Sequence, residues 1–244
     1  MCNLKFSLIY IYMRINELKN KHIGRDVVIL TCGPSLTEYP RNKVIPFLKD
    51  KIVFCVKESI IEYKEYANYF IANGTRDRNF DIQGETIKIY QGSNPETNIK
   101  YDLIIEEDRP FKLSLQLLKI KNFEKYDLEN FEKRPWGPGI LYETVFYLCK
   151  YMGIKNIYTI GWDLIDIKKD TVISHYFDNY KTDNYEKSER WNSVNSINSK
   201  HVEEMTMVNK NITYMYDFFK KKGMNIFVVG NKSYVNKNIP RIYL

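Results

Sequence analysis

Short apolar runs alternate with amphipathic stretches along much of the 244-residue chain. Most residues of these runs are β-branched or aromatic, which is typical of strands buried on both faces of a parallel sheet. Seven strands are predicted in this way, over residues 27–30, 52–56, 69–72, 86–90, 101–105, 157–160 and 225–229. Because helical patterns separate several of them, the sequence predicts an α/β fold with a mostly parallel sheet.

Four helices are predicted, over residues 44–49, 113–120, 140–152 and 202–222. Apolar side chains lie almost all round the third, so this helix should be buried. In the fourth, apolar residues recur at steps of three and four, as in an amphipathic helix. Gly153 and Gly223 follow the last two helices, at the position where glycine is favoured as a C-terminal cap.

Small and polar residues follow several of the predicted strands. The first strand leads into Thr31-Cys32-Gly33-Pro34-Ser35, and residues 157–160 lead into Gly161-Trp162-Asp163. Because ligands of α/β sheets bind beyond the carboxyl ends of the strands, these loops are candidate binding elements. Gly33 is expected to let the backbone approach a ligand closely, and Ser35 to cap the segment that follows. The loop matches neither GxGxxG nor a Walker A sequence, so a purely structural turn remains an equal alternative. Asp163 could equally cap a helix or bind a lysine.

Residues 164–200 carry many Asp, Lys, Asn and Ser residues and little periodicity. An irregular segment of this length is typical of either a functional lid or a disordered insertion. No repeat and no linker rich in Gly, Pro or Ser divides the chain. A single domain over residues 1–244, with a lid at about 164–200, is therefore the simplest prediction.

Composition and charge narrow the class of protein. The hydrophobic fraction of 44%, with 15% aromatic residues, excludes a wholly disordered chain. Lys and Arg number 37 and Asp and Glu 30, so the net charge is +7. An anionic sugar nucleotide or a membrane surface would suit this excess as well as nucleic acid would. The basic residues are scattered, so nucleic acid is not an expected partner.

The four cysteines and the N-terminal segment indicate where the chain works. The cysteines are scattered without a CxxC pair, which favours a reducing compartment over a disulfide scaffold or a zinc ribbon. Residues 1–13 lack a cleavage site and are interpreted as a partly buried leader, with a foot on a membrane surface as the alternative. We therefore expect a cytoplasmic protein, with peripheral contact at the inner face of the membrane left open.

Histidine is the natural general base for a hydroxyl group, and the chain has only three. His175 lies within the irregular segment, and His201 directly precedes the longest predicted helix. His22 lies upstream of the first strand and is not expected to take part in chemistry. The candidate acid–base groups are therefore His175 and His201.

The order of these motifs resembles a known group of proteins. A strand followed by Gly33-Pro34-Ser35, a FIANG run, a Gly-rich turn before a buried helix and an IYTIGWD run resemble the bacterial sialyltransferases of glycosyltransferase family 42. The pattern is also similar to a wider Rossmann-like group with the motility accessory factors and the hydroxymethylpterin pyrophosphokinases. The resemblance covers about residues 27–233. It implies a Rossmann-like, mostly parallel sheet flanked by helices, with a lid insertion.

The resemblance implies roles for particular residues. His201 falls on the position of the family's general base and His175 on a lid position that contacts phosphate, with the family's lid-to-base spacing kept without a gap. Tyr176 and Arg134 would help to stabilise the leaving phosphate. The remaining implied donor contacts are Cys32, Gly33, Pro34, Ser35, Lys57, Asn73, Gly137, Pro138, Gly139 and Asp163. Cys32 and Pro138 replace an asparagine and a serine of the family, and Ile165 replaces a lid tyrosine.

The implied function is transfer of a sugar, sialic acid or a related one, from a CMP-type donor to a glycan acceptor in surface polysaccharide biosynthesis. No metal and no cofactor are expected. The alternative is a pyrophosphokinase-like transferase that uses ATP and Mg²⁺ on a pterin-like alcohol, with Asp163 and Asp178 as metal ligands. A third reading is a basic binding module without activity. The sequence leaves the formation of a homo-oligomer open.

Overall fold

The computed structural model describes residues 13–73, 80–82, 84–92, 99–108, 123–128, 134–135, 144–163 and 199–244. The predicted helix over 113–120, the predicted lid up to residue 198 and residues 1–12 lie outside these ranges. No helix within the described residues is long and apolar enough to cross a membrane.

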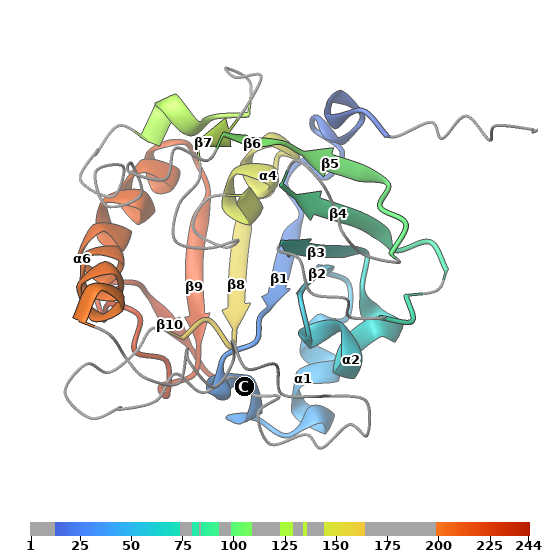
Figure 1. Cartoon of the computed structure of the whole chain (residues 1–244). Helices are drawn as coiled ribbons and strands as arrows, with labels where there is room; N and C mark the ends of the chain where they lie inside the picture. The colour runs from blue at the N-terminus through green and yellow to red at the C-terminus, as the bar shows by residue number, and fades with distance from the viewer. Residues whose placement is uncertain are drawn as a thin grey trace, which may run out of the picture.

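One eight-stranded sheet dominates the structure, with the strand order β10-β9-β8-β1-β2-β3-β4-β5 (Figure 1). Each neighbouring pair in it is parallel, which confirms the predicted α/β, Rossmann-like fold class. All seven predicted strands are present, with ends that shift by at most two residues. The strands are β1 (Asp26–Leu30), β2 (Ile52–Val56), β3 (Tyr69–Asn73), β4 (Ile87–Gln91), β5 (Leu103–Ile105), β8 (Asn156–Ile160), β9 (Asn225–Val229) and β10 (Arg241–Ile242).

The helices follow the predicted pattern where the structure describes them. They are α1 (Arg41–Leu48), α2 (Ser59–Tyr63), α4 (Phe146–Tyr151) and α6 (Ser199–Lys221). Short 3-10 turns are η1 (Ile15–Leu18), η2 (Pro34–Thr37), η3 (Lys64–Tyr66) and η4 (Phe123–Tyr126). A separate two-stranded parallel sheet joins β6 (Glu107–Asp108) to β7 (Arg134–Pro135). Helix α2 and strand β10 were not predicted from the sequence.

Two helices cover each face of the sheet. Helices α4 and α6 pack on one face, in a cluster with Val27, Ile29 and Phe54. Helices α1 and α2 pack on the other face, in a cluster with Val28 and Leu30. Alternate residues of β1 thus enter different cores, which explains why its sequence is apolar without a break.

Crossover handedness explains which helix lies on which face. From β1 to β2 the chain moves across the sheet in one direction, and from β8 to β9 it moves in the other. Crossovers between parallel strands are right-handed, so opposite directions of travel place α1 and α6 on opposite faces. The sheet order itself therefore determines the layers.

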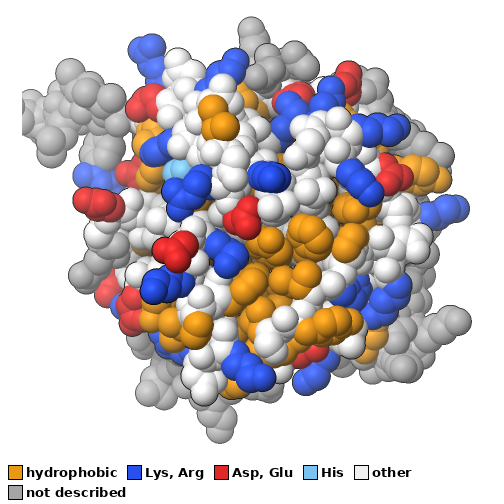
Figure 2. All heavy atoms as spheres, turned by 180° about the vertical axis from the view of Figure 1, so that it is seen from behind, with side chains coloured by type: hydrophobic (Ala, Val, Ile, Leu, Met, Phe, Trp, Pro, Cys, Tyr) orange, Lys and Arg blue, Asp and Glu red, His pale blue; other side chains and the backbone are white. Residues whose placement is uncertain are grey.

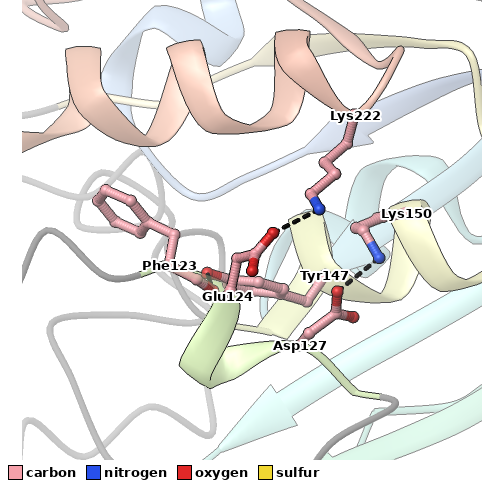
Figure 3. A network of polar contacts seen from close by, with 6 residues as sticks. All are labelled: Phe123, Glu124, Asp127, Tyr147, Lys150 and Lys222. Atoms are coloured by element: carbon pink, nitrogen blue, oxygen red, sulfur yellow. Dashed lines mark hydrogen bonds and ion pairs between the residues drawn. The ribbon is translucent and has the colours of Figure 1, made fainter.

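Polar contacts hold η4 against α4 and the end of α6 (Figure 3). The Tyr147 hydroxyl donates to the Phe123 carbonyl at 2.7 Å, and Lys150 Nζ lies 2.6 Å from Asp127 Oδ2. Lys222 Nζ contacts Glu124 Oε1 at 2.5 Å, and this hydrogen bond raises the pKa of Lys222. Lys150 lies near the end of α4 and Lys222 just after α6, and these two helices lead into β8 and β9, so the network lies at the amino edge of the sheet.

Replacement of Phe219 by alanine tests the packing of α6. Phe219 is fully buried, with ring centroids 5.0 Å from Tyr147 and 6.0 Å from Phe146. We expect Phe219→Ala to lower the free energy of unfolding by about 3–5 kcal/mol, because it leaves a cavity between α6 and the sheet. Tyr214→Ala on the same helix, at a residue that is 38% exposed, should cost much less. Denaturant titration measures both, and equal losses would contradict this packing.

Candidate functional site

The order of the sheet reverses between β1 and β8. The chain leaves β1 for β2, β3, β4 and β5 on one side and then returns to β8 on the other side of β1. At such a switch point the loops after the two neighbouring strands leave in opposite directions, and α/β proteins bind ligands beyond it. The loops at this point are residues 31–36 after β1 and residues 161–163 after β8.

These two loops pack against each other closely. Gly33 N donates to the Gly161 carbonyl at 2.9 Å. A Cβ on Gly33 would collide with that carbonyl oxygen and lie 2.5 Å from Asp163 Oδ2. The φ of Gly33 is −73°, so the residue is required for close packing rather than for an unusual backbone conformation. The close approach that was expected toward a ligand is made, in this structure, to the protein's own β8 loop.

Asp163 and Ser35 present buried polar atoms at the switch point. Ser35 N donates to Asp163 Oδ2 at 2.6 Å. Asp163 Oδ1 and Ser35 Oγ are buried and form no hydrogen bond with any described residue. Burial raises the pKa of Asp163, against the opposing effect of the Ser35 N–H. The expected capping by Ser35 is wrong: Gly33 occupies the N-cap position of η2, which has no side-chain cap.

The end of β2 contributes a second pair of polar side chains. The Cys32 thiol lies 3.0 Å from Glu58 Oε2 and 3.1 Å from the Val56 carbonyl oxygen, and all of these atoms are buried. Lys57, which lies between Val56 and Glu58 in the sequence, has a φ of +52°, a left-handed conformation that is uncommon outside glycine. Such strain is often found at functional sites, and here it lies beside the switch point.

A carboxylate ties the loop after β9 to the same edge. Glu38 accepts hydrogen bonds from the backbone N–H groups of Asn231 at 2.8 Å and Lys232 at 2.9 Å. A Cβ on Gly230 would collide with that carboxylate. The Arg241 guanidinium holds the rest of the loop through hydrogen bonds to three carbonyl groups, those of Ser233, Val235 and Ile239.

Helix α6 begins at this carboxyl edge. Its residue Asn209 donates through Nδ2 to the Tyr234 carbonyl at 3.1 Å and accepts from Asn236 N at 2.8 Å, both in the segment after β9. The helix ends at Lys221, just before β9 begins at Asn225, so its first residues lie beyond the carboxyl ends of the strands (Figure 1). His201, which is described here as backbone only, lies about 12 Å from Asn209 along the helix axis.

The other candidate residues divide between the same edge and the rest of the chain. Asn73 is the last residue of β3 and therefore lies at the carboxyl edge. Arg134 of β7 lies opposite Glu107 of β6 in the register of the two-stranded sheet. Strand β6 comes just after β5, which is four strands from β1 in the main sheet. His22 hydrogen-bonds the Tyr69 hydroxyl at 2.7 Å at the opposite edge, so its predicted lack of a role in the site agrees with its position. The described residues do not include the remaining candidates, His175, Tyr176, Gly137, Pro138 and Gly139.

Three residues of this edge were missed by the sequence analysis: Glu38, Glu58 and Ser233. A pair of charged residues, Lys57 and Glu58, follows a fully apolar strand, and this signal could have indicated Glu58. Glu38 and Ser233 make contacts over long separations, Glu38 to Asn231 and Ser233 Oγ to the Trp162 carbonyl at 2.6 Å, and no local pattern indicates them. Among the described residues, no group of three His, Cys, Asp or Glu side chains could hold a metal ion.

Comparisons with known proteins agree with this architecture. No family model and no curated protein matches the chain. Among solved structures, the sialyltransferase CstII from Campylobacter jejuni, in complex with a substrate analogue, cytidine-5'-monophosphate, aligns at 14% identity and a TM-score of 0.44, over 90% of this chain and 85% of that one. MAf glycosyltransferase from Magnetospirillum magneticum AMB-1 aligns at 11% identity and a TM-score of 0.50, over 95% of this chain.

The chain spans 37% of the length of the MAf glycosyltransferase. At these identities the second alignment supports a shared α/β fold, and the first is too weak to carry an argument.

Replacement of Asp163 by asparagine tests its burial. Because the pKa of Asp163 is raised in the folded state above its ordinary value of 3.8, the folded protein binds a proton more tightly than the unfolded chain. Wild-type stability therefore falls as pH rises from 3.8 through the raised value. Asp163→Asn keeps an acceptor for Ser35 N–H and removes this titration, so its stability relative to wild type should increase over that window. Denaturant unfolding across pH measures the difference, and a pH-independent difference would contradict a buried carboxyl group here.

Proposed function

We propose that the chain is a glycosyltransferase that moves a sugar from a nucleotide-sugar donor of the CMP type to a glycan acceptor. The single observation that carries the proposal is the switch point between β1 and β8, where buried polar atoms of Ser35 and Asp163 lie without hydrogen-bond partners among the described residues. The likeness in fold to a MAf glycosyltransferase supports the same class of protein.

Electrostatics favour one orientation of the donor. Asp163 and Glu58 are acidic groups beside the switch point, and a carboxylate would repel a phosphate placed against it. The hydroxyl and amino groups of a nucleoside can instead hydrogen-bond the carboxyl oxygen and the Ser35 hydroxyl. The nucleoside would therefore occupy the switch point, and the sugar-phosphate end would extend toward the start of α6, where the helix dipole favours negative charge.

Direct displacement would complete the reaction. His201, at the start of α6, would take the proton of the acceptor hydroxyl, and the acceptor oxygen would form a bond to the anomeric carbon. The bond from that carbon to the phosphate oxygen would break, CMP would leave with the electron pair, and the configuration at the anomeric carbon would invert. In this proposal no metal ion and no cofactor takes part.

A panel of nucleotides tests the donor class. CMP, CDP, UDP, GDP and ATP are added separately to the purified chain, and the thermal unfolding midpoint is measured. We expect CMP to raise the midpoint most, by an amount that grows with its concentration, because a ligand that binds only the folded state stabilises it. Stabilisation by ATP with Mg²⁺, abolished by EDTA, would contradict this proposal and favour the pyrophosphokinase-like alternative.

Replacement of His201 by alanine tests the proposed base. General-base catalysis contributes about 10²–10⁴-fold, so His201→Ala should lower the transfer rate by that factor while CMP binding stays close to wild type. His22→Ala, at the opposite edge of the sheet, is the matched control and should retain transfer. Full transfer activity in His201→Ala would exclude the assigned base.

A further inference from the structure

Part of one sheet face is apolar and open in this structure. Figure 2 shows hydrophobic side chains gathered on the face that lies behind the sheet in Figure 1, bordered by charged side chains of both signs. We define the open face by five residues that are not fully buried: Phe47, Tyr158, Phe227, Ile242 and Leu244. The rings of Tyr158 and Phe227 stack at 5.3 Å, and Phe47 packs edge-on against Tyr158 at 5.4 Å.

The topology explains why this face has no helix over it. The described crossover from β8 to β9 ends in α6, on the opposite face. Helices α1 and α2 lie on the same face as the open face. They belong to the crossovers from β1 to β2 and from β2 to β3, so they cover this face over those strands. Within the described residues, no helix lies over β9 and β10 on the face of Phe227 and Ile242. An aromatic and aliphatic surface of this kind is typical of an interaction site.

The polar atoms on this face are already hydrogen-bonded to each other. Asn156 Nδ2 donates to Asp26 Oδ1 at 2.8 Å, and Asn225 Nδ2 donates to Asn156 Oδ1 at 3.0 Å. Lys51 Nζ donates to the Phe47 carbonyl at 2.8 Å and lies 4.3 Å from the centroid of the Phe47 ring. Because Asp26, Asn156 and Asn225 have partners within the face, a second surface could cover these three side chains at a lower desolvation cost.

We infer that the open face binds a second copy of this chain, through a two-fold, face-to-face contact of the two sheets. The amino edge beside it carries both signs of charge, with Arg25 and Lys155 next to Asp26 and Asp50. In a two-fold contact a residue away from the axis meets a different residue of the partner, so cations of one copy can face carboxylates of the other. This inference does not depend on the proposed function.

An anionic bilayer fits the same face less well. Asp26 and Asp50 would be repelled by anionic headgroups, and Lys51 points along the aromatic rings toward a carbonyl group rather than outward. Salt should weaken binding to anionic lipid, because it screens the attraction between the headgroups and a chain of net charge +7.

Sedimentation velocity of the full chain over a concentration series tests the inference. Wild type should approach twice the 29.2 kDa of one chain. Phe227→Arg should shift the protein to monomer, raising the dimer dissociation constant at least tenfold. Ile61→Arg adds the same charge at a residue of α2 that is 45% exposed and should leave the dimer intact. Circular dichroism checks that each variant folds.

Leu244→Arg, at the last residue of the chain, decides the question if Phe227→Arg does not fold, and it too should give monomer. A wild-type chain that stays monomeric at all concentrations would overturn the inference. A dimer that survives both Phe227→Arg and Leu244→Arg would overturn it as well, because the contact would then use another surface. Monomeric wild type that co-sediments with phosphatidylserine vesicles, and loses this on Phe227→Arg, would overturn it in favour of a membrane.

Discussion

The contact between Gly33 and the loop after β8 is the constraint on which the candidate site depends. Only a residue without a side chain lets the Gly33 backbone lie against the Gly161 carbonyl and the Asp163 carboxyl group. That approach allows Ser35 N–H to reach Asp163, which in turn keeps a carboxyl group buried at the point where the sheet order reverses. The candidate site is thus built from two segments 128 residues apart in the sequence, joined by the parallel pairing of β1 and β8.

The two edges of the sheet are held in different ways. At the amino edge, ion pairs such as Lys150 with Asp127 join one helical element to another. At the carboxyl edge, acidic side chains bind loop backbone or a thiol, as Glu38 does with Asn231 and Lys232, and Glu58 with Cys32. The carboxyl edge therefore keeps its loops in place through groups that belong to the edge itself. Two of its buried polar atoms, Ser35 Oγ and Asp163 Oδ1, have no described hydrogen-bond partner, which suits an edge that binds a ligand.

The apolar pattern was sufficient to predict strands β1 to β5, β8 and β9, because their runs are short and most of their residues are β-branched or aromatic. Strand β10 was not predicted, because it has only two residues and is defined by its pairing with Val228 and Val229. The loops after β1 and β8 were predicted as candidate binding elements from strand ends alone. The contact of Cys32 with Glu58 could not be predicted from the sequence, because it depends on the register of β1 with β2, which brings Glu58 to the thiol. Gly33 was expected to allow close approach to a ligand, but in the structure it allows close packing against the loop after β8.

The central claim is that a nucleotide binds at the switch point between β1 and β8. A crystal structure of the chain grown with CMP tests it most directly. The account predicts the nucleoside within hydrogen-bond distance of Ser35 Oγ and Asp163 Oδ1, with its phosphate directed toward the first turn of α6. A nucleotide bound at the amino edge, or one at the carboxyl edge that touches neither of these residues, would contradict it.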